Sequence, residues 1–269
     1  MVVARFRRLP HPRRVASPQE SRAGANYDAD FYRGQRDGSR SSAAAILPRL
    51  IDWFRPSSVV DVGCGVGTWL SEARRLGIED VIGVDGDHVD RSLLEIPSDR
   101  FLPRNLDEPL NLGRRFDLVL CLEVAEHLPS LSADALVKSL TEAGPVVVFS
   151  AAIPGQGGNG HVNEAWPEAW ARRFAEHGYA WSDPLRALYW NDPRVEAWYA
   201  QNLLVFHRAD ALAAVPWRQE PTTEWPLSLV HPTSFLRAVD RANRRPTLKR
   251  AWREFRRAIR AGFTGGAGG

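Results

Sequence analysis

The fold is decided by residues 61–67, which read Asp-Val-Gly-Cys-Gly-Val-Gly. The apolar run Ser58–Val62 predicts a short buried strand, and Thr68–Leu76 predicts a helix that Gly77 ends. Glycines between a strand and a helix let the backbone turn sharply and approach a ligand closely. The helix N-terminus behind them offers free N–H groups to that ligand. We therefore expect a ligand-binding turn at residues 63–67.

Strands and helices alternate on both sides of this turn. Further strands are expected at Asp80–Val84, Phe101–Arg104, Phe116–Leu122, Val146–Ser150, Tyr179–Leu188 and Asn202–His207. Helices are expected at Ala43–Phe54, Ser132–Glu142, Ala165–His177 and Phe235–Ile259, with Pro48 starting or kinking the first and Pro246 splitting the last. This alternation favours a parallel, doubly wound α/β sheet.

Charge divides the 269 residues, whose net charge is +3, into three parts. Residues 1–26 hold six Arg and one Glu, which is +5, and are predicted to be a disordered basic arm. Residues 234–269 hold nine Arg and one Lys against two acids, which is +8, and are predicted to be a basic helical segment with a flexible glycine tail. Residues 27–233, the expected catalytic domain, therefore carry −10. Because nucleic-acid enzymes usually carry positive charge on the catalytic domain, this distribution argues against a nucleic-acid partner.

The amino-acid composition indicates the cellular compartment in which the protein is expected. Hydrophobic residues make up 44% of the chain, which is enough for a sizeable core, and no apolar run is long enough for a membrane span. The basic start lacks the apolar segment of a secretory signal. Two cysteines, Cys64 and Cys121, exclude a disulfide scaffold and favour a reducing cytoplasm. We expect a soluble cytoplasmic protein. Its C-terminal Arg-rich helix is a candidate either to lie on an anionic membrane or to pack on a second subunit in a homodimer.

Two acids accompany the glycine turn. Asp61 precedes it, and Asp85 lies at the tip of the next strand, where a carboxylate can accept both ribose hydroxyls of a nucleoside. A dinucleotide fingerprint would require glycine at position 68, which is threonine. The chain resembles the class I S-adenosylmethionine (SAM) methyltransferases over about residues 40–207. The motifs that carry the resemblance are residues 61–67, Asp85, Asn105-Leu106 and Glu123–Leu128.

The resemblance implies a seven-stranded Rossmann-like sheet in a three-layer α/β/α arrangement, with SAM as the cofactor. It implies that Gly63, Gly65 and Gly67 pass under the methionine moiety of SAM, and that Glu123 closes the methionine pocket. Asp61 is then expected to orient the loop and the SAM amine, and Asp85 to bind the ribose. Asn105 and Leu106 stand where this family often has an Asp that meets the adenine amine.

A second motif, Glu123-Val-Ala-Glu126-His127, follows the fourth strand. In a helical turn its three polar groups share one face. With His161, from the loop after the fifth strand, they form a candidate site for a divalent metal such as Mg²⁺. This arrangement resembles the metal-assisted O-methyltransferases of ubiquinone biosynthesis and the small-RNA terminal 2′-O-methyltransferases. Many family members carry the run without a metal, and His161 or His127 is then the expected general base.

These observations predict a SAM-dependent methyltransferase that acts on a hydroxyl of a small molecule, such as a sugar or a secondary metabolite. One alternative is metal-assisted 2′-O-methylation of an RNA end. Another is a SAM-binding or partner-binding protein without turnover. The glycine-rich Gly155–Gly160 segment is expected to be a flexible lid. The aromatic residues of the second half are expected to form either core or an acceptor pocket; they are Trp166, Trp170, Trp181, Trp190, Trp198 and Tyr199.

Overall fold

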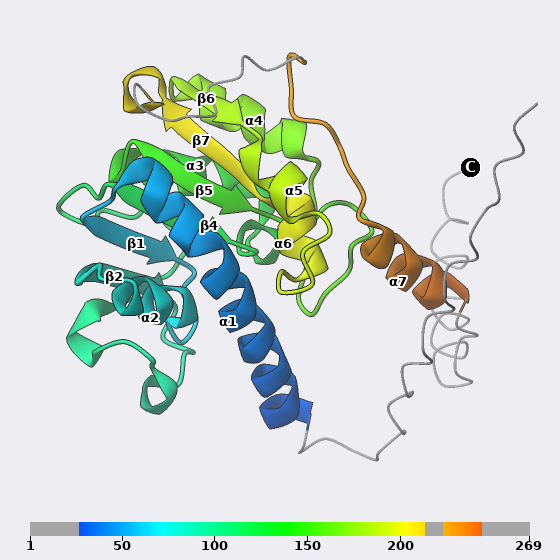
Figure 1. Ribbon diagram of the computed structural model, residues 1–269, viewed down its shortest axis with the longest axis horizontal. Coiled ribbons are helices and arrows are strands. Elements are labelled where there is room, and N and C mark those ends of the chain that lie inside the picture. The colour runs from blue at the N-terminus through cyan, green and yellow to red at the C-terminus, as the bar shows by residue number, and fades with distance from the viewer. Residues whose placement is uncertain (1–26, 213–222, 244–269) are drawn as a thin grey trace, which may run out of the picture.

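A seven-stranded sheet runs through the centre of the computed structural model, in the order β3-β2-β1-β4-β5-β7-β6 (Figure 1). The structure describes residues 27–212 and 223–243. The strands are β1 (Ser58–Val62), β2 (Asp80–Asp85), β3 (Phe101–Pro103), β4 (Leu118–Leu122), β5 (Val146–Ser150), β6 (Tyr179–Ser182) and β7 (Leu204–Arg208). The strands from β3 to β5 pair in parallel, and β7 is antiparallel to both β5 and β6. The expected doubly wound sheet is confirmed, with an antiparallel pair at one edge.

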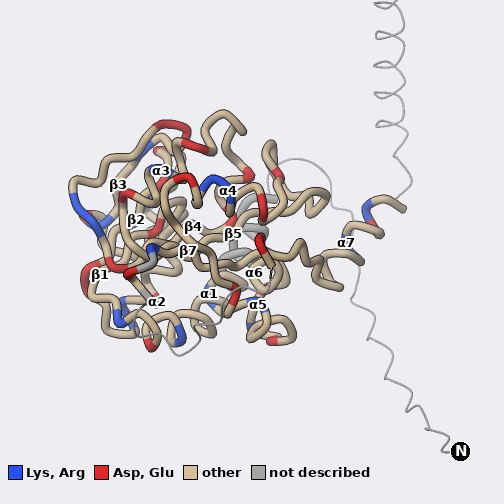
Figure 2. The backbone as a smooth tube through the Cα atoms, turned by 90° about the horizontal axis from the view of Figure 1, so that it is seen from above, with Lys and Arg blue, Asp and Glu red and all other residues tan. Residues whose placement is uncertain are grey.

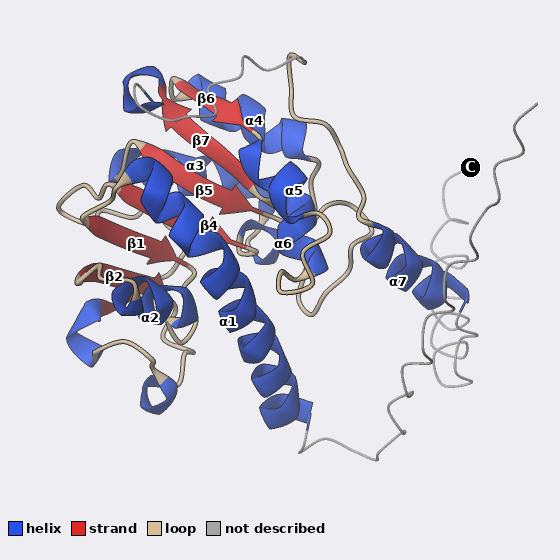
Figure 3. Cartoon of the chain, viewed as in Figure 1, coloured by secondary structure: helices blue, strands red, loops and turns tan. Residues whose placement is uncertain are grey.

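Helices cover both faces of this sheet (Figure 3). They are α1 (Tyr27–Phe54), α2 (Thr68–Arg75), α3 (Ala133–Ala143), α4 (Pro167–Glu176), α5 (Pro184–Tyr189), α6 (Ala197–Asn202) and α7 (Pro232–Asn243). One buried apolar cluster joins α1, α2, α5 and α6 to residues such as Val59, and a second joins α3 and α4 to the next residue, Val60. Since successive strand residues point to opposite faces, each cluster fills one side of the sheet. The three-layer α/β/α prediction is therefore confirmed.

The sheet reverses its strand order between β1 and β4. From β1 the chain moves outward through β2 and β3, and from β4 it moves outward the other way through β5. In open α/β sheets, ligands bind at such a switch point, beyond the carboxyl ends of the strands. Backbone hydrogen bonds draw the loops together there: Gly63 N donates to Val84 O at 2.7 Å, and Glu123 N donates to Ser150 O at 2.9 Å.

Three predicted boundaries differ from the structure. Asn202, predicted to begin the last strand, is the last residue of α6, and β7 begins at Leu204. The first helix begins at Tyr27 rather than Ala43 and continues through Pro48, so Tyr27, Phe31 and Tyr32 lie within it. The apolar period indicated only the buried half of the helix, because the residues before Ala43 are mostly polar. The predicted strand Tyr179–Leu188 ends at Ser182, because Pro184, which has no N–H, begins helix α5.

The structure describes only part of the predicted C-terminal helical stretch. The helical stretch expected from Phe235 appears as α7, while its continuation past residue 243 and the arm of residues 1–26 lie outside the described residues. Within the described ranges, no helix combines the length and the apolar character that crossing a membrane requires.

Candidate functional site

The glycine turn has a backbone that residues with a side chain rarely adopt. Gly63 and Gly67 have φ angles of 87° and 86°, in the left-handed region. A Cβ atom at Gly63 would overlap Val124, and one at Gly67 would lie 2.9 Å from Ile96 Cγ1. A Cβ at Gly65 would meet nothing within 4 Å. The first and last glycines therefore allow close packing, whereas Gly65 borders open space that a ligand could enter.

Asp85 connects the tip of β2 to this turn. Its Oδ2 accepts a hydrogen bond from Gly65 N and its Oδ1 accepts one from Gly86 N, both at 2.7 Å. The residue is 8% exposed. Each carboxylate oxygen can accept a second hydrogen bond, so Asp85 can hold the turn and still receive the hydroxyls of a ligand. Sequence reasoning did not indicate that it also holds Gly65.

Asp61 is a buried carboxylate in the middle of the sheet. It lies in β1, is 2% exposed, and makes no side-chain hydrogen bond to any residue the structure describes. Burial, together with the charge of Asp85, raises its pKa from 3.8 to about 8. A buried carboxylate without a partner is costly unless a cationic group neutralises it. Asp61 therefore fits a ligand that brings a positive charge to this edge.

Glu123 follows β4 in a strained backbone conformation. Its φ is 56°, which is uncommon for a residue with a side chain. Its Oε2 accepts from Gln156 Nε2 at 2.9 Å, and its Oε1 accepts from Asn202 Nδ2 at 3.0 Å. Burial raises the pKa of Glu123, and these hydrogen bonds oppose the shift. Sequence reasoning missed both amide partners, since nothing local to Glu123 points to residues so far along the chain.

The second motif places Glu126 and His127 in a short 3₁₀ turn at Ala125–His127. Glu126 is fully buried, and neither carboxylate oxygen has a hydrogen-bond partner among the described residues. Burial and the nearby Glu123 raise its pKa from 4.5 to about 9. Its backbone carbonyl accepts from Val162 N at 2.8 Å and from Asn163 N at 3.1 Å. These bonds bring the loop after β5 against the loop after β4.

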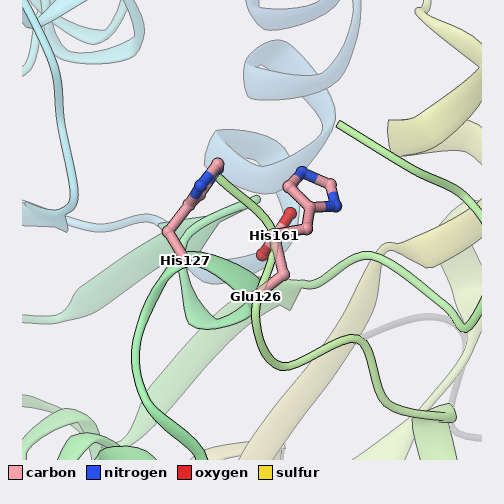
Figure 4. A group of neighbouring side chains, drawn as sticks. All are labelled: Glu126, His127 and His161. Carbon is pink, nitrogen blue, oxygen red and sulfur yellow. The ribbon is translucent and has the colours of Figure 1, made fainter. Parts of the chain in front are cut away.

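That contact brings His161 to His127. The imidazole centroids are 4.9 Å apart, with the rings at 87°. One ligand atom from each of Glu126, His127 and His161 lies within 4.8 Å of the other two (Figure 4). Partial loss of hydration and the nearby His161 lower the pKa of His127, whose side chain remains exposed. Three of the four predicted metal ligands therefore lie together, whereas the carboxylate of Glu123 is bound to amides outside this group.

Glu164 organises the loop that carries His161. One carboxylate oxygen bonds His161 Nδ1 at 2.9 Å and accepts from Gly157 N at 2.7 Å, and the other accepts from Gly155 N at 2.7 Å. Although burial acts in the opposite direction, these hydrogen bonds hold the pKa of Glu164 below its usual value. Glu164 lies only three residues after His161, so the sequence contained a local indication of this role that we did not use.

Asn105 and Leu106 follow β3, near the carboxyl ends of the parallel strands. Leu106 is buried in the core. Asn105 is exposed, and its amide is engaged locally: Oδ1 accepts from Asp107 N at 3.1 Å and Nδ2 donates to Glu108 at 3.0 Å. The amide of Asn105 therefore bonds within its own turn.

The sheet order and this edge define a class I methyltransferase type of fold. A family model described as a methyltransferase domain matches residues 32–191, and the chain belongs to that family. It is thus a methyltransferase, and SAM is the cofactor expected of such enzymes. No curated protein matches the chain.

Two solved structures show the same fold. DesVI from Streptomyces venezuelae is 18% identical, with a TM-score of 0.50, and the match covers 66% of this chain and 95% of that one. KedS8 from Streptoalloteichus, a sugar N-methyltransferase, is 19% identical, with a TM-score of 0.50, and the match covers 72% of this chain and 97% of that one.

Proposed function

We propose that this enzyme transfers the methyl group of SAM to a hydroxyl group of a small organic acceptor. The observation that carries the proposal is the cluster of Glu126, His127 and His161, whose two imidazoles are proton-accepting groups where the loops after β4 and β5 meet. Methyl transfer to oxygen forms a C–O bond, breaks a C–S bond and releases the hydroxyl proton. An imidazole beside the acceptor is suited to take that proton.

The cofactor fits the groups that border the glycine turn. The sulfonium and the amine of SAM are cationic, and the unpartnered carboxylate of Asp61 lies beside the turn. Asp85 has acceptor capacity for the ribose hydroxyls, and Gly65 borders open space. SAM supplies an activated methyl group when it is bound. The residues of the chain then need to align the acceptor, exclude water and accept a proton.

His127 is the residue we assign as the general base. Partial loss of hydration and the neighbouring His161 lower its pKa, which favours the neutral imidazole that can accept a proton. His161 is oriented by Glu164, much as a carboxylate orients a catalytic imidazole in other enzymes. We assign His161 to hold the acceptor hydroxyl against His127.

The same cluster fits a divalent metal ion. Glu126, His127 and His161 would hold it, because a buried carboxylate with two free oxygens and two imidazoles is a common donor set. A bound metal would lower the pKa of the acceptor hydroxyl. The Glu-x-x-Glu-His motif would then supply two ligands, Glu126 and His127, with Glu123 outside the metal shell.

Exposed apolar side chains support a small organic acceptor. Leu131, Val162 and Trp166 are 94%, 67% and 41% exposed, and they belong to the loops that follow His127 and contain His161. Exposed apolar groups on the loops that carry the reactive residues suit an acceptor with an apolar part. Acidic and basic residues are interspersed around the domain rather than gathered into a basic face (Figure 2). This distribution supports a small acceptor over RNA.

Two other acceptors belong to the same test. A metal-type cluster is the observation that favours 2′-O-methylation of an RNA end. Because one similar structure is a sugar N-methyltransferase, amino sugars belong to the acceptor panel as well.

The experiment has two stages. Calorimetric titration with SAM and with its demethylated product, in EDTA and then with Mg²⁺ or Mn²⁺, tests the cofactor and the metal. Methyl transfer is then measured on sugars, amino sugars, phenolic metabolites and a short RNA. We expect His161→Ala and His127→Ala to lower turnover by about 100-fold at unchanged SAM affinity. The control His177→Ala removes an exposed histidine at the end of α4. Absence of SAM binding, or transfer to RNA alone, would overturn the proposal.

A further inference from the structure

Gln156 uses all its polar groups to join elements that are distant in the sequence. It lies in the glycine-rich loop after β5, between Gly155 and Gly157, which both have positive φ angles. Such glycines give the loop freedom that a packed segment would not have. A half-buried glutamine with every polar group engaged is therefore unusual at this position.

The side chain of Gln156 bridges Glu123 and helix α6. Its Nε2 donates to Glu123 Oε2 at 2.9 Å. Its Oε1 accepts from Gln201 Nε2 and from Asn202 Nδ2, each at 2.9 Å. Gln201 and Asn202 are 1% and 4% exposed. Because these bonds are shielded from water and one goes to a carboxylate, breaking them is costly.

The backbone of Gln156 is held from a different direction. Its N–H donates to Ile153 O at 2.9 Å. Its carbonyl accepts from Arg241 Nη2 at 2.6 Å, and the same nitrogen donates to Gly155 O at 2.8 Å. Arg241 belongs to α7, which is beyond the end of the sheet in Figure 1. One residue of the loop thus receives support from β4, α6 and α7.

Helix α7 is itself fixed to the domain close to α6. Gln201 Oε1 accepts from His231 N at 2.9 Å, just before α7 begins. Arg237 stacks over Trp198 of α6, with 5.8 Å between the guanidinium carbon and the ring centroid. The support that Arg241 gives to Gln156 therefore comes from a helix that is anchored on the same element as the Gln156 side chain.

We propose that Gln156 is a positioning residue that couples the cofactor side of the site to the acceptor side. Its amide sets the carboxylate of Glu123, and its backbone, held by Arg241, sets the loop that carries Glu164 and His161. The coupling rests on the proposed function for the roles of Glu123 toward SAM and of His161 toward the acceptor. Loss of the Gln156 bonds would loosen both sides at once.

A complementary exchange of side chains tests the bond itself. Gln156→Glu places a carboxylate against Glu123 and removes the donor. Adding Glu123→Gln restores a donor–acceptor pair, with the donor now at position 123 and the bonds from Gln201 and Asn202 retained. Hydrogen exchange of residues 153–164, measured by mass spectrometry, is the readout. We expect about tenfold faster exchange in the single variant and recovery to within about twofold in the double variant.

Two variants of α7 test the backbone contact. Arg241→Gln should speed exchange of the same loop, whereas Asp240→Asn, at the exposed residue just before it on the same helix, should not. SAM titration of Gln156→Met, which keeps the length of the side chain but loses its hydrogen bonds, should show about tenfold weaker binding. With an acceptor in hand, Arg241→Gln should lower kcat more than it changes the KM for SAM.

The outcomes separate this inference from the proposed function. If the wild-type protein binds SAM while Gln156→Glu and Gln156→Met match it in loop exchange and affinity, the coupling is wrong. Failure of the double variant to recover also overturns it. If the wild-type protein binds no SAM, the proposed function fails, while recovery of loop exchange in the double variant still supports the Gln156 bridge.

Discussion

At the scale of single residues, the site is distinguished by acids that are buried near the carboxyl ends of the parallel strands. Asp61, Asp85 and Glu126 are 2%, 8% and 0% exposed. Burial raises the pKa of both Asp61 and Glu126. A protein does not gain stability from such groups, because an unpaired buried carboxylate loses its hydration. Their arrangement is understandable if cationic ligands complete the site.

This reasoning predicts that Asp61→Asn stabilises the protein when SAM is absent. The pKa of Asp61 is about 8 in the folded state, against 3.8 ordinarily. An acid whose pKa is raised by folding contributes stability in full only at low pH, where it is protonated. That contribution is lost as pH rises from about 4 to about 8. At pH 8 we expect Asp61→Asn to raise the unfolding free energy by about 2 kcal/mol in urea titrations, with no difference near pH 4.

The same variant should bind SAM more weakly, because asparagine carries no charge. Asp107→Asn, which alters an exposed acid, serves as the control. A lower stability of Asp61→Asn at pH 8 would show that the carboxylate is better accommodated in the fold than its burial indicates.

Asp85 should behave differently, because it serves the protein as well as the ligand. Asp85→Ala removes the acceptor of the Gly65 and Gly86 N–H groups together with the expected ribose contact. We expect SAM affinity to fall by at least about 100-fold in calorimetry. Asp87→Ala, which removes only an exposed pair with Arg91, should leave affinity unchanged. Near-normal affinity of Asp85→Ala would remove this residue from the cofactor site.

At the scale of elements, the sequence predicted those whose signals are local. The strands Ser58–Val62 and Val146–Ser150 are at their expected bounds, because each is a short apolar run that is buried on both faces. The start of α1 escaped prediction, since its first turns have no apolar period. The roles of Gln156 and Asn202 escaped for another reason: their partners are tens of residues away, and only the folded sheet brings them together.

Helix α1 continues through Pro48, although a proline usually interrupts a helix, and this can be tested. Pro48 is exposed within the helix, where it cannot donate to the carbonyl of Ala44. Pro48→Ala restores that donor, so we expect the unfolding free energy to rise by about 1 kcal/mol in chemical denaturation. Asp52→Ala, one turn later, removes only an exposed pair with Arg55 and should change stability by less than about 0.5 kcal/mol. A destabilised Pro48→Ala would mean that the proline is required by the helix geometry.

At the scale of the whole molecule, residues 223–231 run back along the domain and lead into α7. Trp181 Nε1 donates to Glu224 O at 3.2 Å, and Arg172 stacks on Trp225 at 4.4 Å. Arg186 donates to Leu227 O at 2.8 Å, and His231 N donates to Gln201 Oε1 at 2.9 Å. Each contact joins this segment to a different element: β6, α4, α5 and α6. The position of α7, and with it the contact of Arg241 to the glycine-rich loop, therefore depends on the segment as a whole.

Arg186 is the contact on which this arrangement should depend most. It is 1% exposed and forms a two-pronged pair with Asp183 in addition to its bond to Leu227. Arg186→Leu leaves the partly exposed Asp183 without its partner and leaves Leu227 O without its donor, so we expect the unfolding free energy to fall by about 2 kcal/mol. Arg194→Leu breaks a similar pair with Asp192 whose arginine is 66% exposed, and it should cost less than about 1 kcal/mol.

Hydrogen exchange shows whether the effect of Arg186 reaches the site. If residues 223–231 hold α7 in place, Arg186→Leu should speed exchange in α7 and also in residues 153–164, which Arg241 contacts. Faster exchange in residues 223–231 alone would mean that α7 is held by its own contacts with α6. Equal losses of stability in Arg186→Leu and Arg194→Leu would mean that burial does not set the strength of these pairs.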